Sequence, residues 1–433
     1  MEHSDLIVKS EYLQNPKEAK FYIKNFKSII KYLYLANNFH IYCLIITNET
    51  HEDIKDIRYH LNNNQKNPVF NEENLLFNCT TQEQQQWCDE FNFNYEINDS
   101  PIVFDNFQPI KLDGPPSWAF QNNSIFYCFY NDDNIKIIHL EGLEHNWNIL
   151  HLLKNNIYTL ISWPCYFHKW LYEYSCNSIY TRNENYNRKN IIFLSPNLDG
   201  ILWAYEYGYN AILTNHNCFL DYNIFTINND EPIKYNMVMN CRPELWKRPY
   251  LAESVSDLAY IKGYNFNKED IYDYSKLKCK FMNKKIISSQ EVNAIYNQSY
   301  CAGIFSEKEG ACYSSSEYLL CGLPVISTFS KGGRDTWYTQ HNSIIVEPTK
   351  EDVTNAVEQC ILKMQSGEFN RQEIRDNHIN MASQMRKNII NCIKYIFYLH
   401  NIEVDVSEYW EKQFFHKFIK NENYDYVFKI LES

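Results

Sequence analysis

Residues 306–328 read SEKEGACYSSSEYLLCGLPVIST, and this stretch carries most of the information about the fold and the function. Glu309 and Glu317 stand eight positions apart, with one glycine and three consecutive serines between them. Serine is a favoured N-cap residue, and the spacing of Ser314 and Glu317 fits a capping box, which predicts a helix that begins there. Gly322 is placed to end that helix, and the apolar residues after it predict a buried strand.

A helix that begins at these serines is suited to binding a phosphate group. Its free backbone N–H groups and the positive end of its dipole point at the preceding loop, which contains Glu309 and Gly310. Glycine lets backbone approach a ligand closely, and an ionised carboxylate only accepts hydrogen bonds. Glu309 is therefore a candidate partner for sugar hydroxyls, and Glu317 for ribose hydroxyls. The alternative is that Glu317 only completes the capping box while Glu309 is a solvated loop charge.

The longer pattern resembles the C-terminal half of the retaining glycosyltransferases with the GT-B fold, in particular glycosyltransferase family 4 (glycosyl transferases group 1). Those enzymes carry two glutamates with seven residues between them, a helix of small and aliphatic residues, a Gly-Leu-Pro-Val type of segment and a Gly-Gly loop. The matching features in this chain are Glu309, Glu317, CGLPV at 321–325, KGGRD at 331–335 and NSIIVEP at 342–348. The resemblance is strong over about 235–350.

The resemblance implies a role for each residue of the motif. The first glutamate of the family holds the transferred sugar, which assigns that role to Glu309, and the second holds the nucleotide ribose. The donor-binding residues that follow from the match are Glu317, Gly310, Ala311, Gly332 and Gly333. Backbone amides of the first glycine and alanine would help to orient the sugar, and the paired glycines would let their loop approach the donor.

A second match lies upstream, where residues 235–242 read YNMVMNCR, a strand pattern that ends in Arg242. Lys247 and Arg248 follow within one loop. The family uses an arginine and a lysine at this place to neutralise the donor diphosphate. A leaving nucleoside diphosphate gains negative charge as the glycosidic bond breaks, and these side chains stabilise that charge. We assign this role to Arg242 and Lys247, with Arg248 as the nearest rival to Lys247 and solvated surface charges as the alternative.

The N-terminal half offers weaker candidates, because residues 1–200 lack the early Gly-Gly loop of many family members. A histidine of the N-terminal domain often faces the donor sugar in the family, and His139, at the end of an apolar strand pattern, is the candidate for that role. An ordinary strand-end histidine is the alternative. His168 and Lys169 stand among aromatic residues that could stack on an acceptor or contact a membrane surface, or form a buried cluster. His216, near the expected domain junction, is a further candidate.

Length and composition limit the class of protein. With 433 residues the chain is too long for one ordinary core, so two domains are expected, and 45% hydrophobic and 16% aromatic residues are enough to fill large cores. The net charge of −12, from 41 basic and 53 acidic residues, disfavours duplex nucleic acid as a partner, because binding it needs a basic face. It also disfavours a membrane held by bulk charge, although a local patch for peripheral contact is compatible with it.

The cysteines and the N-terminal residues indicate the compartment. Fourteen cysteines are scattered without paired CxxC spacing, and the start, MEHSD, has no feature of a signal peptide. We therefore expect reduced thiols and a cytoplasmic protein. No run of about 18 apolar residues is present, so no membrane-spanning helix is expected. Cys312 and Cys321, within the motif, are interpreted as small packing residues rather than as catalytic thiols.

Short apolar runs separated by helical patterns predict parallel sheets in both halves of the chain. In the first half these runs are 135–140, 158–162, 191–195 and 211–214. In the second half the expected elements are strands at 258–266 and 301–305, and helices at 288–299 and 352–364. Ser288 and Glu291 predict a capping box at the start of the first of these helices. Residues 22–47 fit a helix followed by a strand.

The expected fold class is α/β, a GT-B arrangement of two doubly wound, Rossmann-like domains that face a cleft. We interpret the polar segment 221–234 as the interdomain linker. The predicted domains are an N-terminal acceptor-side domain, 1–228, and a C-terminal nucleotide-sugar-binding domain, 229–402. In GT-B proteins the last helix crosses back, so residues from about 403 to 433 are expected to complete the first domain. Ligands in such folds bind at the carboxyl ends of the strands, where both motifs fall.

These features lead us to expect a glycosyltransferase, EC 2.4, that transfers a hexose-type sugar with retention from a nucleoside diphosphate donor to a glycan or lipid-linked acceptor. No metal and no cofactor is implied, because Arg242 and Lys247 supply the positive charge that a divalent ion supplies elsewhere. No nucleophilic carboxylate is evident on the opposite side of the sugar, so front-side attack fits better than a covalent intermediate. Family habit suggests a surface glycan and contact with the cytoplasmic face of the membrane.

Two alternatives remain open from the residues alone. The first is a GT-B sugar-nucleotide 2-epimerase, which would need carboxylates and histidines that face the sugar from both domains. The second is a non-catalytic GT-B interaction subunit, against which the intact set of Arg242, Lys247, Glu309 and Glu317 argues. The donor base, the sugar, the acceptor and the oligomeric state are not specified by the sequence.

Overall fold

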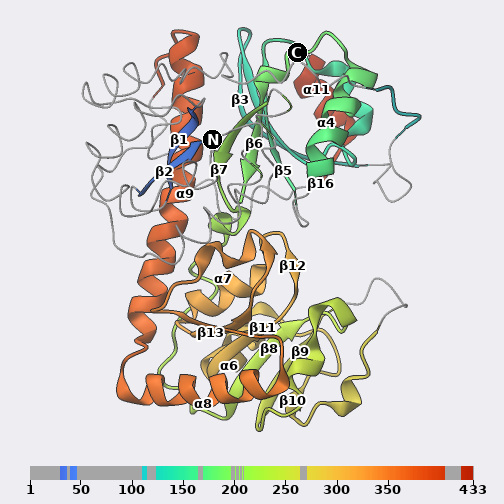
Figure 1. Cartoon of the computed structure of the whole chain (residues 1–433). Coiled ribbons are helices and arrows are strands. Elements are labelled where there is room, and N and C mark those ends of the chain that lie inside the picture. The colour runs from blue at the N-terminus through green and yellow to red at the C-terminus, as the bar shows by residue number, and fades with distance from the viewer. Residues whose placement is uncertain are drawn as a thin grey trace, which may run out of the picture. The chain divides into compact units, whose positions relative to one another are not determined.

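The structure is a computed structural model, and the residues that it describes are 30–36, 40–45, 110–114, 123–163, 169–196, 200, 204, 207, 209–263, 271–404 and 421–432. The chain divides into two compact units (Figure 1). Unit 1 comprises Met1–Ser162, His168–Thr214 and Gln384–Ser433, and unit 2 comprises Trp163–Phe167 and Asn215–Ser383. The chain passes from unit 1 to unit 2 between Thr214 and Asn215, and it returns to unit 1 between Ser383 and Gln384.

Six strands in the described part of unit 1 form one sheet, in the order β16-β3-β4-β5-β6-β7. Their bounds are β3 Asn123–Asn131, β4 Lys136–Glu141, β5 Ile157–Ser162, β6 Ile191–Ser195, β7 Asn210–Leu213 and β16 Asn421–Asn423. Strands β4 to β7 are parallel, whereas β3 and β16 join the edge antiparallel. Strands β4, β5 and β6 are buried along their whole length, which explains their continuous apolar runs. The four predicted strands of this half are confirmed.

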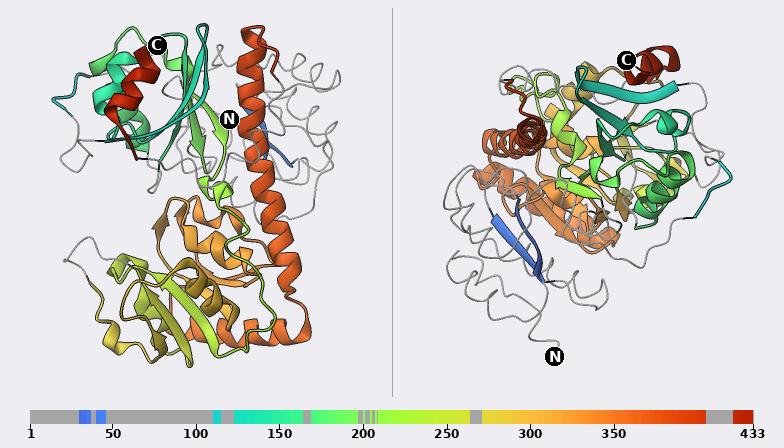
Figure 2. Two further views of the ribbon diagram at one scale, coloured as in Figure 1. Left: turned by 180° about the vertical axis from the view of Figure 1, so that it is seen from behind. Right: turned by 90° about the horizontal axis from the view of Figure 1, so that it is seen from above.

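Three described helices belong wholly or in part to unit 1 and pack around its sheet. Helix α4, Lys169–Arg182, and helix α11, Tyr424–Glu432, lie side by side and both contact the 3-10 helix η3, Trp147–Leu152 (Figures 1 and 2). The last turns of α9, Arg371–Leu399, pack on the same unit, where the rings of Tyr130 and Phe397 meet at 4.7 Å between centroids.

Unit 2 contains a six-stranded sheet whose described strands are all parallel, in the order β10-β9-β8-β11-β13-β15. Their bounds are β8 Tyr235–Cys241, β9 Leu258–Lys262, β10 Cys279–Met282, β11 Ser299–Ile304, β13 Val325–Thr328 and β15 Ser343–Val346. Counted within the unit this is the order 3-2-1-4-5-6 of a doubly wound sheet. The order reverses between β8 and β11, so the crevice outside the carboxyl ends of these two strands is where such a fold binds ligands.

The helices of unit 2 begin and end where local chemistry dictates. Helix α6, Ser289–Asn297, has the predicted capping box of Ser288 and Glu291. Helix α8, Lys350–Ser366, begins after Thr349, whose hydroxyl accepts a hydrogen bond from a backbone N–H, and ends at Gly367 in the left-handed conformation. It packs across β8, β11, β13 and β15 (Figure 2).

One expected element differs. Residues 22–47 were expected to contain a helix and then a strand, but Ile30–Ala36 forms strand β1, which pairs antiparallel with β2, His40–Ile45. The β1 segment, IKYLYLA, is rich in aromatic and apolar residues that suit a pleated sheet as well as they suit a helix. Its periodicity alone therefore did not distinguish a strand from a helix. The mixed α/β fold with parallel sheets is confirmed.

Candidate functional site

A cavity of about 300 Å³ lies in unit 2 at the carboxyl ends of β8, β9 and β11, which is where the strand order reverses. Its walls come from Met239 to Arg242 at the end of β8, from Gly263 after β9, and from Gly303 to Ser306 at the end of β11. The loop that leads into α7, Tyr313–Leu320, closes it. The topology of the sheet therefore collects segments far apart in the sequence around one cavity.

Two cations line this cavity, and both contact one tryptophan. Arg242 follows β8 directly, and its Nη2 lies 3.3 Å from Oε2 of Glu244. Lys247 ends the 3-10 helix η6, Leu245–Lys247, and its Nζ lies 4.1 Å from the ring centroid of Trp246, with the guanidinium of Arg242 at 5.5 Å from the same ring. The structure places Lys247 on the cavity wall, whereas Arg248 does not line it and pairs with Glu307 at 2.8 Å.

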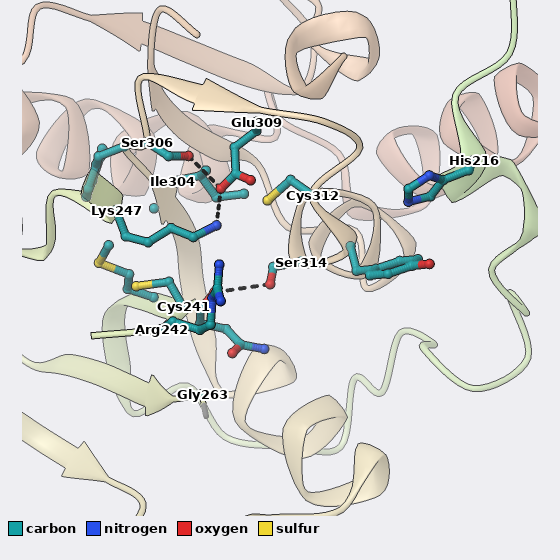
Figure 3. A pocket seen from close by; sticks show the side chains of 15 residues that line it. His216, Cys241, Arg242, Lys247, Gly263, Ile304, Ser306, Glu309, Cys312 and Ser314 are labelled. Carbon is teal, nitrogen blue, oxygen red and sulfur yellow. Dashed lines mark hydrogen bonds and ion pairs between the residues drawn. The ribbon is translucent and has the colours of Figure 1, made fainter. Parts of the chain in front are cut away.

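Glu309 supplies the carboxylate of the cavity. It ends the short strand β12, Lys308–Glu309, which pairs with β14, Lys331–Gly332. Its side chain is almost fully buried, and its Oε1 accepts hydrogen bonds from Lys247 Nζ and, at 2.8 Å, from Ser306 Oγ (Figure 3). No residue in the described ranges donates to its Oε2. One oxygen is thus held by the protein, and the other is available to a ligand.

Arg334, which was not selected from the sequence, supports Glu309 indirectly through Ser306. Its side chain is fully buried and donates from Nη1 to the carbonyl and hydroxyl oxygens of Ser306 at 2.7 and 3.2 Å. Its Nη2 donates to Oγ of Ser327 at 2.8 Å and to the carbonyl of Thr328, and its Nε donates to Asp335 at 2.8 Å. A planar guanidinium with this many partners fixes the loop that presents Ser306 to Glu309.

The glycines of the motif support Glu309 through the backbone. Gly332, with φ of +117°, lies opposite Glu309 in the β12–β14 pair, a conformation that only glycine adopts readily. The N–H of Gly333 donates to the carbonyl of Glu309 at 3.2 Å. These two glycines, and Gly310 and Ala311, are not among the residues that line the cavity.

The start of α7 differs from the prediction, and the capping box of Ser314 and Glu317 was wrong. The residue before the helix is Cys312, which lies in the left-handed region with φ of 54°, and no side chain caps the helix. Ser314 Oγ instead donates to the carbonyl of Asn240 at 3.1 Å. The spacing of Ser314 and Glu317 is compatible with a capping box. In the structure, however, the Ser314 hydroxyl bonds to a strand residue 74 positions away instead of to the helix N-terminus. Cys312, expected to be a packing residue, lines the cavity.

Glu317 is not among the residues that line the cavity. Its Oε2 accepts a hydrogen bond at 2.9 Å from the hydroxyl of Tyr296, which in turn accepts one at 2.6 Å from Nδ2 of Asn240. Burial raises the pKa of Glu317 to about 7. Its carboxylate is therefore tied to the cavity only indirectly, because Asn240 is one of the lining residues.

His216, a further candidate from the sequence, also lines the cavity. It begins the 3-10 helix η5, His216–Phe219, and its ring lies against that of Tyr313 at 5.1 Å between centroids. Burial lowers its pKa to about 4, so the ring is neutral at pH 7. Two flanking asparagines, which were not selected from the sequence, anchor this helix to the loop around Glu309. Asn215 donates to the carbonyl of Gly333, and Asn217 donates to that of Ala311, both at 2.8 Å.

His139 lies in unit 1, on β4, and its side chain is fully buried. Its Nε2 is 2.8 Å from Oγ of Ser162, at the end of the neighbouring strand. Two buried carboxyl groups follow it: burial raises the pKa of Glu141 to about 7 and that of Glu144 to about 8. His168 lies outside the described residues, and Lys169 begins α4 with its Nζ 5.9 Å from the ring centroid of Tyr207.

The described part of the chain contains no group of three or more His, Cys, Asp or Glu side chains placed to hold a metal ion. Nor does any helix within it have the length and apolar character needed to cross a membrane.

No protein-family model and no curated protein matches this chain. Three of the solved structures that are similar to it are the following. Sucrose-phosphate synthase from Thermosynechococcus elongatus is 13% identical over 61% of this chain and 73% of its own, with a TM-score of 0.40. Anabaena HepE, in complex with UDP, is 13% identical over 59% and 81%, with a TM-score of 0.40. A glycosyltransferase from Rickettsia africae is 15% identical over 60% and 76%, with a TM-score of 0.41.

Proposed function

We propose that the cavity of unit 2 binds the diphosphate and sugar of a nucleotide-sugar donor, and that the protein is a retaining glycosyltransferase with a glycan or lipid-linked acceptor. The observation that supports this is the convergence of Arg242, Lys247 and Glu309 on one cavity, at the point where a doubly wound sheet binds ligands. A nucleoside diphosphate needs cations, and a sugar needs hydrogen-bond acceptors.

Donor binding would rearrange one contact. Lys247 and Glu309 form an ion pair on the cavity wall. A diphosphate carries more negative charge than one carboxylate, so it would draw Lys247 toward itself and leave both oxygens of Glu309 for sugar hydroxyls. Ser306 would keep the carboxylate oriented meanwhile, because its hydroxyl donates to Oε1 independently of the lysine.

In the reaction, the bond between the anomeric carbon and the phosphate oxygen breaks, and its electron pair goes to the leaving diphosphate. The acceptor oxygen forms its bond to the same face of that carbon, and its proton passes to the departing phosphate oxygen. Arg242 and Lys247 would stabilise the charge that develops on the phosphate. Glu309, which lies beside these cations, would act as a hydrogen-bond acceptor that orients the sugar. No divalent ion and no cofactor is required by this proposal, and Glu317 would act on the donor site through Tyr296 and Asn240.

A thermal-shift panel tests the donor site. UDP, GDP, ADP and their glucose or mannose derivatives would be added to the wild-type protein and to Arg242→Ala, Lys247→Ala and Arg248→Ala. Ligands that bind the native state raise the melting temperature by mass action. One nucleotide series should stabilise the wild type and Arg248→Ala, the matched control outside the cavity, but not the other two variants. If no nucleotide shifts the wild type, the donor-site proposal is wrong.

Turnover distinguishes transfer from the alternatives. The nucleotide sugar that shifts the melting temperature would be incubated with membrane or glycan acceptors, and the product analysed by NMR for its anomeric configuration. Retention at the anomeric carbon is expected. Release of a free 2-epimer without an acceptor would point to an epimerase instead, and binding without any turnover to a non-catalytic subunit.

A further inference from the structure

We infer that His216 is a specificity-determining residue of this cavity, and that its imidazole forms a hydrogen bond with a hydroxyl group of the sugar-bearing substrate. This inference rests on the proposed donor site and adds a contact that the sugar, rather than the nucleotide, would make. It is carried by the position of His216 on the cavity wall, by the way its helix is anchored, and by the polarity of its surroundings.

The ring of His216 is held in place but keeps its polar atoms available. It lines the cavity and leans on the ring of Tyr313, with the two planes at 41°. No hydrogen bond joins either ring nitrogen to another residue of the described chain. A partly buried imidazole that faces a cavity in this state can satisfy its donor and its acceptor with a ligand or with water.

The helix that carries His216 is anchored at both sides of this residue. Asn215 caps the helix, since its Oδ1 accepts from the N–H of Asn217 at 3.0 Å, and its Nδ2 donates to Gly333. Asn217 Nδ2 donates to the carbonyls of Ala311 and Cys312 at 2.8 and 2.9 Å. Both asparagine side chains are buried. Buried amides aimed at these carbonyls would be costly to leave unpaired, so the position of His216 is well specified.

These hydrogen bonds fix the position of His216 relative to Glu309. The carbonyls that Asn217 holds lie two and three residues after Glu309, and Gly333, which Asn215 holds, is hydrogen-bonded through its N–H to the carbonyl of Glu309. Hydrogen bonds thus connect the segment that carries the imidazole of His216 to the segment that carries the carboxylate of Glu309. Any ligand that contacts the available oxygen of Glu309 enters a cavity whose other wall is His216.

The charges in the cavity are separated from His216. In Figure 3, Lys247 and Arg242 lie on the left of the cavity and His216 lies on the right, with Cys312 between them. Burial keeps the pKa of His216 low and that of the Cys312 thiol high, at about 12, so both groups are neutral at pH 7. A neutral wall is better suited to hydroxyl groups than to a diphosphate, which the cations at the other end would hold.

The test compares a nucleoside diphosphate with its sugar derivative on His216→Ala and His216→Gln. The pair used would be whichever of UDP with UDP-glucose, GDP with GDP-mannose or ADP with ADP-glucose stabilises the wild type most. Loss of one hydrogen bond is expected to weaken binding of the nucleotide sugar, or to lower its kcat/KM, by about five- to tenfold. Affinity for the nucleoside diphosphate should be unchanged, and glutamine, which keeps a donor and an acceptor, should restore part of the loss.

His341→Ala is the matched control, because His341 is exposed and lies outside the cavity. Each variant would first be shown to melt at the wild-type temperature without ligand, and the glutamine variant serves if alanine prevents folding. Equal affinity of wild type and His216→Ala for the nucleotide sugar overturns the inference, as does an equal loss for diphosphate and nucleotide sugar. If the wild type binds no nucleotide at all, the proposed function fails and the inference with it, whereas the first two results leave the donor site intact.

Discussion

At the scale of single residues, the carboxylate of Glu309 is the centre of the site. Its two oxygens have different surroundings, since Oε1 receives hydrogen bonds from Lys247 and Ser306 while Oε2 receives none from the described chain. A group with one oxygen held and one available is preorganised, because little reorganisation is needed when a ligand arrives.

We predict that Glu309→Gln lowers turnover of the nucleotide sugar by about a hundredfold while the nucleoside diphosphate binds at least as well. The amide keeps the size of the side chain but loses a negative charge that opposes a diphosphate nearby. Steady-state kinetics and a binding titration with the diphosphate measure the two effects. Wild-type turnover in this variant would remove Glu309 from the mechanism.

A second residue-scale prediction concerns the path from Arg334 to Glu309. Ser306→Ala removes the hydroxyl that joins them, whereas Ser327→Ala removes another partner of the same guanidinium that does not touch Glu309. We expect Ser306→Ala to lower kcat by about tenfold and Ser327→Ala to leave it within about twofold, because only the first variant frees the carboxylate. Equal effects in both would mean that Arg334 serves stability alone.

At the scale of elements, two helix ends with the same backbone conformation differ in their surroundings. Gly322, after α7, and Gly367, after α8, have φ of +70° and +79°. A Cβ on Gly322 would lie 2.4 Å from the backbone carbonyl oxygen of Arg371, whereas a Cβ on Gly367 would meet nothing within 4 Å. The first position therefore requires glycine for conformation and for space, and the second for conformation only.

We predict that Gly367→Ala lowers the free energy of unfolding by about 1 kcal/mol, the strain of a left-handed alanine. Gly322→Ala should cost at least about twice as much, because the carbonyl of Arg371 must also move. Chemical denaturation followed by circular dichroism measures both. Equal losses of unfolding free energy would mean that the backbone at the start of α9 moves at no measurable cost.

At the scale of the whole molecule, unit 1 buries two carboxyl groups whose pKa is raised, and unit 2 has a partly buried one whose pKa is also raised. Glu141 and Glu144 lie in unit 1, with the ring of His145 3.4 Å from Oε1 of Glu144, and Glu317 lies in unit 2. A pKa raised by folding means that the native state binds more protons than the unfolded state. The stabilisation is complete below the ordinary pKa of glutamate, about 4.5, and is lost as the pH rises through about 7 to 8.

The melting temperature is accordingly expected to fall between pH 6 and pH 9. Glu144→Gln, which keeps the shape without an ionisable group, should melt several degrees above the wild type at pH 9 and close to it at pH 5. Differential scanning calorimetry across this range is the measurement. A wild type and a Glu144→Gln variant that respond identically to pH would show that Glu144 is not kept protonated by the fold.

Much of the fold followed from local patterns. The strands β4 to β7 were predicted because buried parallel strands are continuous apolar runs, and the capping box at Ser288 was predicted because both of its residues lie within one turn. Arg242, Lys247 and Glu309 were selected from motif spacing, and they line one cavity. Arg334, Asn215 and Asn217 were missed, because the partners that connect them to the site, Ser306, Gly333 and Ala311, lie 28 to 118 positions away.

What the sequence determined by itself is therefore whatever depends on nearby residues: periodicity, caps, charge and the motif around Glu309. The tertiary structure alone decided which polar groups are buried and what they bond. It turned Glu317 toward Tyr296, replaced the expected cap at Ser314 by a contact with Asn240, and placed His216 beside Tyr313. For Glu317 and Ser314 the physical reason is that a polar group removed from water must find a partner, and these partners lie 21 and 74 positions away.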